Sequence, residues 1–286
     1  MSTKVPSSPE VVIQATRGFH LVAWRDIYAY RDLLWLLVWR DFVARYKQTA
    51  LGPIWHIAQP LVTTVIFTVI FSHVAALSTN DLPPTLFYLC GLLAWNYFSQ
   101  TFTSTSSALV ANANLFGKVY FPRLVVPLAG VFSNFISFLI QFVTFLVFLV
   151  LYRLGHPAAT CGLGWSALLL PLLLVQLACL SLGVGLWLAA LTAKFRDFAV
   201  LSGFIIQLWM YVTPVIYPLT QVPSQWRLVA AINPVTVPVE CFRVMLLGNG
   251  YISFHLFAVS IAATVFALFT GLLIFERVEK TFVDIV

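Results

Sequence analysis

Charged side chains are scarce in this sequence, and their scarcity excludes an ordinary water-soluble protein. Only 9% of the 286 residues are charged, whereas 60% are hydrophobic; soluble domains carry roughly 25% charged residues. In water such a chain would expose large apolar patches. In a bilayer, backbone polar groups must be satisfied within helices or a closed barrel. Because the apolar runs are long and do not alternate as barrel strands do, we predict an all-α integral membrane protein.

Sequence motifs for nucleotide, metal or catalytic chemistry are also lacking. No GxxxxGK[ST] motif occurs, so no P-loop is present to hold phosphates, and HExxH, GxSxG and paired catalytic carboxylates are absent. The four cysteines, Cys90, Cys161, Cys179 and Cys241, show no CxxC spacing. We therefore expect a chain that is not an enzyme and that binds no metal and no cofactor of its own.

Acidic residues are missing from the apolar runs, and all ten lie outside them. Proton-coupled carriers usually keep ionisable groups near the bilayer midplane, so an ion-coupled carrier is disfavoured. His56 and His73 lie near the two ends of the first run and are expected to be hydrogen-bonded packing residues rather than a proton relay. No His/Asp or His/Glu pair suits a membrane-embedded enzyme such as a glycan acyltransferase.

Six apolar runs are long enough to cross the roughly 30 Å hydrocarbon core of a bilayer. They predict six transmembrane helices at Ile54–Leu77, Leu86–Val110, Leu124–Tyr152, Trp165–Ala193, Ala199–Leu219 and Ile252–Phe275. With both termini in the cytoplasm, all but three of the 16 Lys and Arg residues lie inside, the exceptions being Arg153, Arg227 and Arg243. The positive-inside rule favours this orientation.

A helix of a different kind is predicted before the first span. Trp35, Trp39, Phe42 and Tyr46 recur at spacings of four, three and four, which places them on one helical stripe. Charged residues accompany them, among which we single out Arg40 and Arg45. The pattern predicts an amphipathic helix in the headgroup plane. The alternative is a seventh span, which the charged pairs Arg31/Asp32 and Arg40/Asp41 would make costly.

The segment between the fifth and sixth runs is too polar to span and too long for a simple turn. Two apolar pieces, Trp226–Ile232 and Val235–Leu247, are separated by Asn233-Pro234, and pieces of this length indicate re-entrant or interfacial helices. Glu240 and Arg243 are spaced i,i+3 and are expected to pair. The alternative is an ordered external loop with a surface ion pair.

Neutral polar and aromatic side chains are the main chemistry within the runs. The amides of Asn96, Gln100, Asn134, Gln141, Gln176 and Gln207 are expected to form interhelical hydrogen bonds, and Ser181 and Gly185 form a small-xxx-small pair suited to close packing. Aromatic rings beside amides would suit a sugar-conducting path, for which the candidates are Trp95, Tyr97, Phe98, Trp209, Tyr211 and Tyr217. The alternative is that these rings belong to interfacial belts.

The loop Ala111–Arg123 is short, basic and aromatic, and Pro122 stands near its end. A compact cytoplasmic element of this kind is suited to docking onto a partner subunit. The alternative is a plain turn whose basic residues act only as positive-inside anchors.

These features together resemble the permease subunit of ABC-2-type exporters, especially those that move O-antigen, capsule or teichoic-acid polysaccharides. The likeness runs over roughly 33–286. The segments that carry it are Trp39–Trp55, Asn114–Arg123 (NLFGKVYFPR), Lys194–Asp197 (KFRD), Ile232–Thr236 (INPVT) and Glu276–Asp284 (ERVEKTFVD).

The resemblance implies a homodimer that binds two copies of a separate ATPase subunit, which holds the ATP and Mg. It implies an interface helix at Leu33–Gln48 and a coupling helix at Asn112–Tyr120. The ATPase-coupling residues would be Asn114, Phe116, Lys118, Tyr120 and Arg123. Gate helices would lie at Pro223–Ile232 and Val235–Leu247, and the outer-gate residues would be Asn233, Pro234, Glu240 and Arg243.

The expected function is therefore ATP-driven export of a lipid-linked polysaccharide, most specifically the O-antigen of lipopolysaccharide, across the bacterial inner membrane. The alternative is an ABC-2-type exporter of a drug or lipid. We expect a polar leader at 1–20 with no cleavable signal peptide, followed by one membrane domain at 21–286. The basic balance, with a pI of about 9.3, is attributed to cytoplasmic loops and not to nucleic-acid binding.

Overall fold

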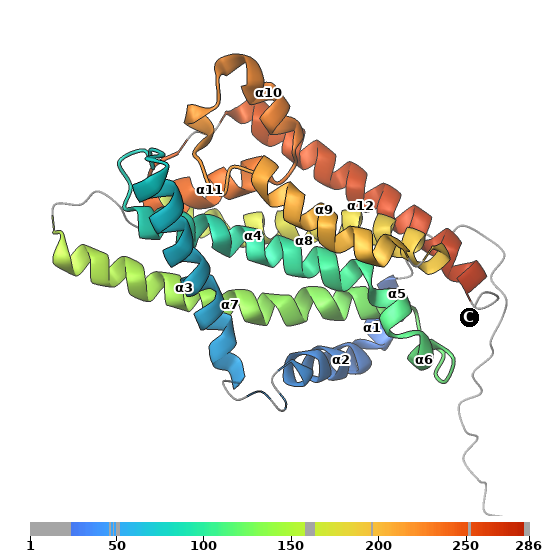
Figure 1. Ribbon diagram of the computed structural model, residues 1–286. Helices are drawn as coiled ribbons and strands as arrows, with labels where there is room; N and C mark the ends of the chain where they lie inside the picture. The colour runs from blue at the N-terminus through green and yellow to red at the C-terminus, as the bar shows by residue number, and fades with distance from the viewer. Residues whose placement is uncertain are drawn as a thin grey trace, which may run out of the picture.

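The protein was analysed as a computed structural model, which describes residues 24–45, 47, 49, 52–157, 164–195, 197–250 and 253–282. The predicted leader at 1–20, Tyr46 and Cys161 lie outside the described residues. Within those ranges the regular structure is entirely helical, as predicted. The helices lie side by side as a bundle, and the shorter elements sit at its two ends (Figure 1).

The first half of the chain forms two short helices, two long helices and then the loop that the sequence predicted to dock a partner. The elements are α1 (Trp24–Ala29), α2 (Arg31–Ala44), the 3-10 turn η1 (Gly52–Ile54), α3 (Trp55–Phe67), the π-helical segment η2 (Thr68–Val74), α4 (Pro84–Ser106), α5 (Ala108–Ala111) and α6 (Ala113–Phe116).

The second half begins with the longest helix and contains a pair of short helices between the last two long ones. The elements are α7 (Val125–Gly155), the 3-10 turn η3 (Trp165–Leu169), α8 (Leu170–Lys194), α9 (Asp197–Val212), the 3-10 turn η4 (Leu219–Gln221), α10 (Ser224–Ile232), α11 (Thr236–Leu247) and α12 (Phe254–Phe282).

Helix ends follow local backbone chemistry. Helix α4 begins with Pro84 in its first turn, where the missing N–H costs nothing. Helix α9 ends at Val212, two residues before Pro214, since the residue before a proline is pushed out of the helical region. Helix α11 ends at Leu247 and is capped by Gly248, whose φ of 77° is the left-handed conformation that glycine adopts most easily.

Six long helices thus match the six predicted runs, and four of them are long and apolar enough to cross a membrane. These four are Trp55–Val74, Val125–Gly155, Ser166–Lys194 and Phe254–Glu279. Helix α9 is apolar but has only 16 residues. Helix α4 has 23 residues, about 34 Å at 1.5 Å per residue, but its second half is rich in Ser and Thr. Six crossings therefore stay a prediction.

The polarity of α4 has a structural reason, because α4 is the central helix of the bundle. Sixteen of its 23 residues are buried, and it packs against α7, α8 and α11. Its side chains form much of the main apolar cluster, together with residues such as Phe138, Leu177 and Phe242 from those neighbours. A helix surrounded by protein does not need a lipid-compatible surface, so its sequence tolerates hydroxyl and amide side chains.

Glycines let α8 approach two neighbours closely. A Cβ on Gly183 would lie 2.5 Å from the backbone nitrogen of Leu268 on α12, and a Cβ on Gly271 would collide with the backbone of Gly183. The predicted small residue Gly185 meets Thr105 of α4, where an added Cβ would lie 2.7 Å from the Thr105 Cβ. The predicted close packing at Gly185 is confirmed, whereas the tighter Gly183–Gly271 crossing was not foreseen.

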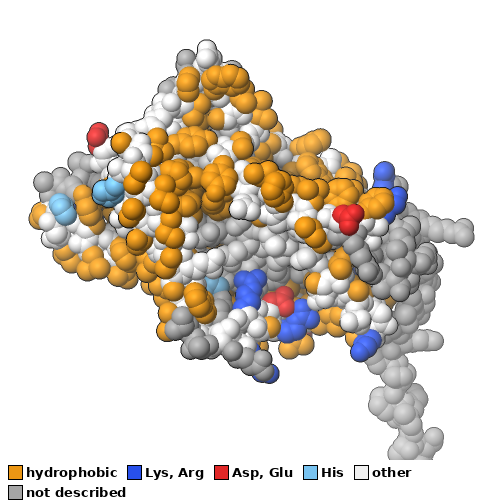
Figure 2. Space-filling model, in the orientation of Figure 1, with side chains coloured by type: hydrophobic (Ala, Val, Ile, Leu, Met, Phe, Trp, Pro, Cys, Tyr) orange, Lys and Arg blue, Asp and Glu red, His pale blue; other side chains and the backbone are white. Residues whose placement is uncertain are grey.

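Basic residues gather at one end of the bundle. Helices α1, α5 and α6 and the C-terminal end of α12 lie together at that end (Figure 1), and Figure 2 shows Lys and Arg side chains there and over α2, with none at the opposite end of this face. Ile27 of α1 packs in the same apolar cluster as Phe275 of α12. The described parts of both chain ends therefore reach the basic end of the molecule.

Helix α2 packs along α7 and differs in detail from the predicted two-faced pattern. Leu34, Leu37 and Val38 are buried against the start of α7, whereas Trp35 and Trp39 are 58% and 64% exposed. Apolar side chains therefore occupy both the protein-facing and the outward-facing sides of α2. The predicted aromatic residues Trp35 and Trp39 thus face outward, while a second apolar face packs on α7; the placement of α2 in the headgroup plane stays a prediction.

Candidate functional site

The predicted ion pair between Glu240 and Arg243 is present and lies in the interior of the protein. Arg243 Nη1 is 3.1 Å from Glu240 Oε1, and the two side chains are only 1% and 2% exposed. This burial excludes the alternative of a surface ion pair on an external loop. A charge pair is stable in such a place only if further polar contacts replace the lost water.

Those further contacts come from α4 and from the turn after α9. Arg243 Nη2 donates to the Val215 carbonyl at 2.7 Å, and the guanidinium carbon lies 3.8 Å from the centre of the Phe87 ring. Glu240 Oε1 accepts from the Leu219 backbone N–H at 2.7 Å. A Cβ on Gly91 would lie 2.9 Å from Arg243 Nη2. Arg243 and Glu240 therefore join α11 to α4 and to the 213–221 turn.

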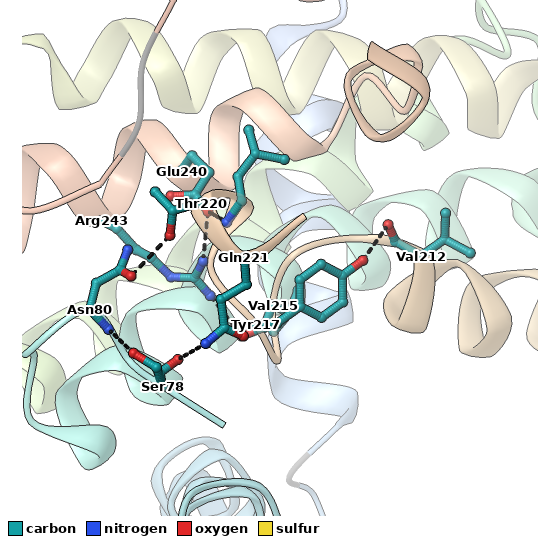
Figure 3. A network of polar contacts seen from close by, with 10 residues as sticks. Ser78, Asn80, Val212, Val215, Tyr217, Thr220, Gln221, Glu240 and Arg243 are labelled. Atoms are coloured by element: carbon teal, nitrogen blue, oxygen red, sulfur yellow. Dashed lines mark hydrogen bonds and ion pairs between the residues drawn. The ribbon is translucent and has the colours of Figure 1, made fainter. Parts of the chain in front are cut away.

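The same region continues into the loop between η2 and α4. Thr220 Oγ1 donates to Asn80 Oδ1 at 2.9 Å, Gln221 Nε2 donates to the Ser78 carbonyl at 3.2 Å, and Tyr217 donates to the Val212 carbonyl at 3.3 Å. Figure 3 shows these contacts beside the Glu240–Arg243 pair. Two loops distant in sequence are thus connected to α11 at the end of the bundle opposite α6.

Asn233 and Pro234, the other predicted gate residues, connect α10–α11 to α9 and α12. Trp209 Nε1 donates to Asn233 Oδ1 at 2.9 Å, and Asn233 Nδ2 donates to Thr213 Oγ1 at 2.8 Å. The Pro234 carbonyl accepts a hydrogen bond from Ser260 Oγ at 2.9 Å, and Ser260 in turn accepts from Gln176. The predicted gate residues are therefore joined to their surroundings, and gating itself stays a prediction.

The six aromatic residues predicted to line a sugar path divide into two groups. Trp95, Tyr97 and Phe98 are core residues of α4, with exposures of 4%, 3% and 0%. The other three lie at or after the end of α9: Trp209 packs edge-on against Phe98 with ring centres 5.2 Å apart, Tyr217 is half-buried, and Tyr211 is 53% exposed. Of the six, Tyr211 has the largest exposed fraction. The channel role stays a prediction for all of them.

The predicted coupling loop forms two one-turn helices, α5 and α6, followed by a turn and an irregular segment. Asn114 and Lys118 are exposed, and Tyr120 is 80% exposed. Phe116 packs on Phe121 with ring centres 5.5 Å apart. The loop therefore presents a basic and an aromatic side chain outward from the basic end of the bundle.

Arg123 behaves differently from the rest of this loop, since it is only 9% exposed. Its Nη1 donates to the Glu279 carbonyl at 2.5 Å, its backbone N–H donates to Glu279 Oε1, and its guanidinium stacks on Phe116. Arg123 thus fastens the loop to α12. The coupling role of Arg123 and the docking role of the loop stay predictions.

Helix α2 is tied to the rest of the protein by the two predicted arginines. Arg40 pairs with Asp41 at 2.7 Å and donates to Asn112 Oδ1 at 3.0 Å, which joins α2 to the α5–α6 loop. Arg45 Nη2 donates to Asn134 Oδ1 on α7 at 2.7 Å. Phe42 lies parallel to the His56 ring at 6.2 Å. Burial lowers the pKa of the Arg45 guanidinium, and the nearby Asp41 carboxylate opposes this effect.

A polar cavity of about 280 Å³ lies where α2 meets α3, α4 and α7. The sequence analysis did not foresee it. Its lining is Arg45, Trp55, His56, Gln59, Pro60, Thr63, Asn96, Gln100 and Gln141. The predicted interhelical amide bond is confirmed beside it, because Asn96 Nδ2 donates to Gln141 Oε1 at 3.2 Å.

Nucleophile and metal chemistry find no support in the described part of the chain. Cys90, Cys179 and Cys241 are free thiols. Burial raises the pKa of the Cys241 thiol to about 12, so it stays protonated. No group of three or more His, Cys, Asp or Glu side chains is arranged to hold a metal ion within the described ranges.

Comparisons with known proteins agree with this architecture. The family model "ABC-2 type transporter" matches residues 32–247. A Klebsiella pneumoniae protein named O-antigen export system permease protein RfbA is 28% identical over 254 residues, which is 89% of this chain and 95% of the relative.

Two further relatives extend the same pattern. The Myxococcus xanthus O-antigen export system permease protein RfbA is 31% identical over 212 residues, covering 73% of this chain and 78% of the relative. The Escherichia coli polysialic acid transport protein KpsM is 24% identical over 249 residues, covering 84% and 91%. The family match extends from α2 through α11, and the chain therefore belongs to the ABC-2 type transporter family of membrane proteins.

Proposed function

We propose that this chain is the membrane-spanning permease of an ATP-driven exporter that moves a lipid-linked polysaccharide, specifically the O-antigen of lipopolysaccharide, across the bacterial inner membrane. The observation that carries the proposal is the similarity, over 73% to 89% of this chain, to two proteins named O-antigen export system permease and to a polysialic acid transport protein. These three names share one cargo class, a polysaccharide.

The sequence has no nucleotide-binding motif, which supports the assignment of ATP hydrolysis to a separate subunit. No P-loop occurs in the sequence, and export against a gradient needs an energy source. We therefore assign ATP and Mg to a separate ATPase subunit, two copies of which would bind a homodimer of this chain. The α5–α6 loop is the proposed contact, because Lys118 and Tyr120 are exposed at the basic end of the bundle.

The proposed topology has six crossings, with both termini in the cytoplasm. The four apolar spans supply four crossings. Helix α4 would cross as a protein-enclosed helix, and α9 together with the 213–219 turn would complete the remaining crossing. The gathering of Lys and Arg at the end that holds α6 supports a cytoplasmic location for that end (Figure 2).

Helices α10 and α11 are proposed as an outer gate that re-enters the membrane from the periplasmic side. They lie between α9 and α12, and α11 is buried against α4 and α8. The Glu240–Arg243 pair and the Asn233 contacts would hold this gate closed when no polymer passes.

The proposal is tested by a clean deletion of the gene in its native host. Surface polysaccharide and cytoplasmic lipid-linked glycan are then quantified side by side. Loss of surface glycan with accumulation of lipid-linked glycan inside is the expected result, and complementation with the intact gene should reverse both changes. If both pools stay normal, the chain does not export a polysaccharide.

A further inference from the structure

The polar cavity next to Arg45 has the composition of an anion site. Arg45 is a cation among its lining residues, and no Asp or Glu takes part. The remaining polar groups are neutral, chiefly the amides of Gln59, Asn96, Gln100 and Gln141. Guanidinium and amide N–H groups donate hydrogen bonds, so the lining offers one positive charge and several donors to an incoming group.

Arg45 forms no ion pair with a carboxylate in the described part of the chain, although the nearby Asp41 carboxylate acts on its charge. Its hydrogen bond is to the neutral amide oxygen of Asn134, whereas the nearby carboxylate of Asp41 is held by Arg40 at 2.7 Å. A guanidinium presents five N–H donors, and Asn134 takes only one of them. Arg45 is exposed in this structure, so its remaining N–H donors are open to an incoming ligand.

Asn134 in turn is held so that it orients Arg45. Its Nδ2 donates to Ser104 Oγ on α4 at 3.0 Å, which fixes its oxygen toward Arg45. On the neighbouring turn of α7, Ser137 Oγ is 3.3 Å from His56 Nε2. The cavity wall is therefore built from hydrogen-bonded groups of α3, α4 and α7, and its shape does not depend on α2 alone.

The polar groups are also ordered along the cavity. Trp55 is the first residue of α3, and Thr63 lies eight residues further on, about 12 Å along the helix. Arg45 follows α2 and is placed by its bond to Asn134, one turn of α7 before Ser137, which contacts His56 near the start of α3. The charge is thus at one end, and the neutral amides of Gln100 and Gln141 extend the lining inward across α4 and α7. This order matches a ligand with a negative charge followed by hydroxyl groups.

We infer that this cavity binds the phosphate group of a lipid-linked glycan, with the phosphate on Arg45 and the first sugar against the amides of Gln59, Gln100 and Gln141. The inference rests on the proposed function for the identity of the cargo. Guanidinium groups bind phosphate oxygens through paired, charge-assisted hydrogen bonds. The cavity of about 280 Å³ is far larger than the ~30 Å³ that one water occupies in the liquid. The amides supply the neutral donors and acceptors that sugar hydroxyls need.

Binding is measured on the purified full-length chain in neutral-lipid nanodiscs, with a short-chain prenyl diphosphate carrying one N-acetylhexosamine as the probe. Inorganic phosphate and vesicles containing phosphatidylglycerol are the two comparison probes. Wild-type protein should bind the glycan probe, and Arg45→Gln should weaken binding about tenfold or more, the range for loss of a charge-assisted contact. Arg45→Lys should retain part of the affinity, because the charge remains but the planar fork does not.

Arg31→Gln is the matched control, since Arg31 is on the same helix, is exposed and pairs with Asp32 at the other end of α2; its affinity should stay within about twofold of wild type. Gln100→Leu is a second test, because no hydrogen bond of the Gln100 side chain occurs in the described structure and its loss should not impair folding. This substitution should weaken binding of the glycan probe but not binding of inorganic phosphate.

Four results would overturn the inference. These are unchanged affinity in Arg45→Gln, equal losses in Arg45→Gln and Arg31→Gln, glycan binding matched by inorganic phosphate, and full competition by phosphatidylglycerol vesicles. The last two would assign the cavity to free phosphate or to a phospholipid headgroup. The gene deletion separates this inference from the proposed function: lost surface glycan with unaltered binding in Arg45→Gln would refute the site and leave the export function standing.

Discussion

The indole Nε1 of Trp209 donates a hydrogen bond to Oδ1 of Asn233 at 2.9 Å, which joins the last turn of α9 to the break between α10 and α11. The same oxygen accepts from the Val235 backbone N–H at 3.1 Å. Trp209 was selected from the sequence as a possible sugar-stacking residue, and Asn233 as a gate residue. Their contact shows that hydrogen bonds connect the end of α9 to the break between α10 and α11.

Trp209→Phe should destabilise the protein by about 1 kcal/mol, because it removes the indole N–H while keeping an aromatic ring against Phe98. Trp226→Phe is the matched control, since Trp226 on α10 is 56% exposed, and its effect should stay within about 0.5 kcal/mol. Thermal unfolding of both purified variants in the same detergent measures the difference. Equal stability of the two variants would contradict a role for the Trp209–Asn233 bond.

The buried pair of Glu240 and Arg243 leads to a larger expected effect. Arg243→Met should lower the free energy of unfolding by about 3–5 kcal/mol, because the Glu240 carboxylate would be left buried without its cation. The double variant Arg243→Met/Glu240→Leu should recover part of that loss. Arg40→Met, which breaks the exposed pair with Asp41, should cost less than about 1 kcal/mol.

A double-mutant cycle on Glu240 and Arg243, followed by thermal unfolding, measures their coupling free energy. Coupling near zero, or a double variant as unstable as the sum of the single variants, would show that the two residues do not act as a pair in the folded protein.

The positions of the long helices could be read from the sequence because lipid imposes a simple rule. A span must be continuously apolar over about 20 residues, and the six runs agree with α3–η2, α4, α7, α8, α9 and α12 to within a few residues at most ends. The ends of α9 and α12 differ most: α12 continues to Phe282, seven residues beyond its predicted end at Phe275, and α9 ends the same number of residues before its predicted end. The predicted run for α9 continued to Leu219, whereas the helix ends at Val212, because Pro214 cannot continue the helical hydrogen bonding.

The sequence indicated some residues that make interhelical contacts, such as Gly185 and Gln141, but it did not indicate which helices pack together, since nearly all faces of these helices are apolar. Nothing in the local pattern distinguishes Gly183, which meets Gly271, from Gly203, which meets open space. The cavity beside Arg45 is a similar case. Its residues come from α3, α4 and α7 and from the segment after α2, and only the three-dimensional packing brings them together. The i,i+3 pair at 240 and 243 was predictable because both partners are on one helix.

Gly183 and Gly203 allow a close helix crossing to be compared with an open helix surface. Gly183→Ala should destabilise the protein by about 1–3 kcal/mol, since a Cβ there would lie 2.5 Å from the Leu268 backbone nitrogen and force α8 and α12 apart. Gly203→Ala on α9 has no atom within 4 Å of the new Cβ and should be neutral or stabilising by up to about 1 kcal/mol. Thermal unfolding separates them, and similar behaviour of the two variants would contradict the close α8–α12 crossing.

The coupling loop should show two different responses to charge changes. Lys118→Glu should leave thermal stability unchanged but weaken co-purification of the ATPase partner, because Lys118 is exposed. Arg123→Ala should lower stability by about 1.5–3 kcal/mol through loss of its bonds to Glu279. If Lys118→Glu supports full ATPase binding and transport, the proposed docking surface is elsewhere.

The proposed six crossings can be tested with single cysteines in a background in which the four native cysteines are replaced. A membrane-impermeant maleimide, applied to cells with a permeable outer membrane, should label Asp81→Cys and Thr220→Cys. It should label Lys118→Cys and Phe195→Cys only after the inner membrane is opened. The reason is that α4 separates Asp81 from Lys118, and α9 separates Phe195 from Thr220.

Labelling of Phe195→Cys and Thr220→Cys from the same side would show that α9 does not cross. For α4 the corresponding comparison is Asp81→Cys with Lys118→Cys. If α9 alone failed to cross, the α10–α11 pair would face the cytoplasm, and an outer gate at Glu240 and Arg243 would be excluded.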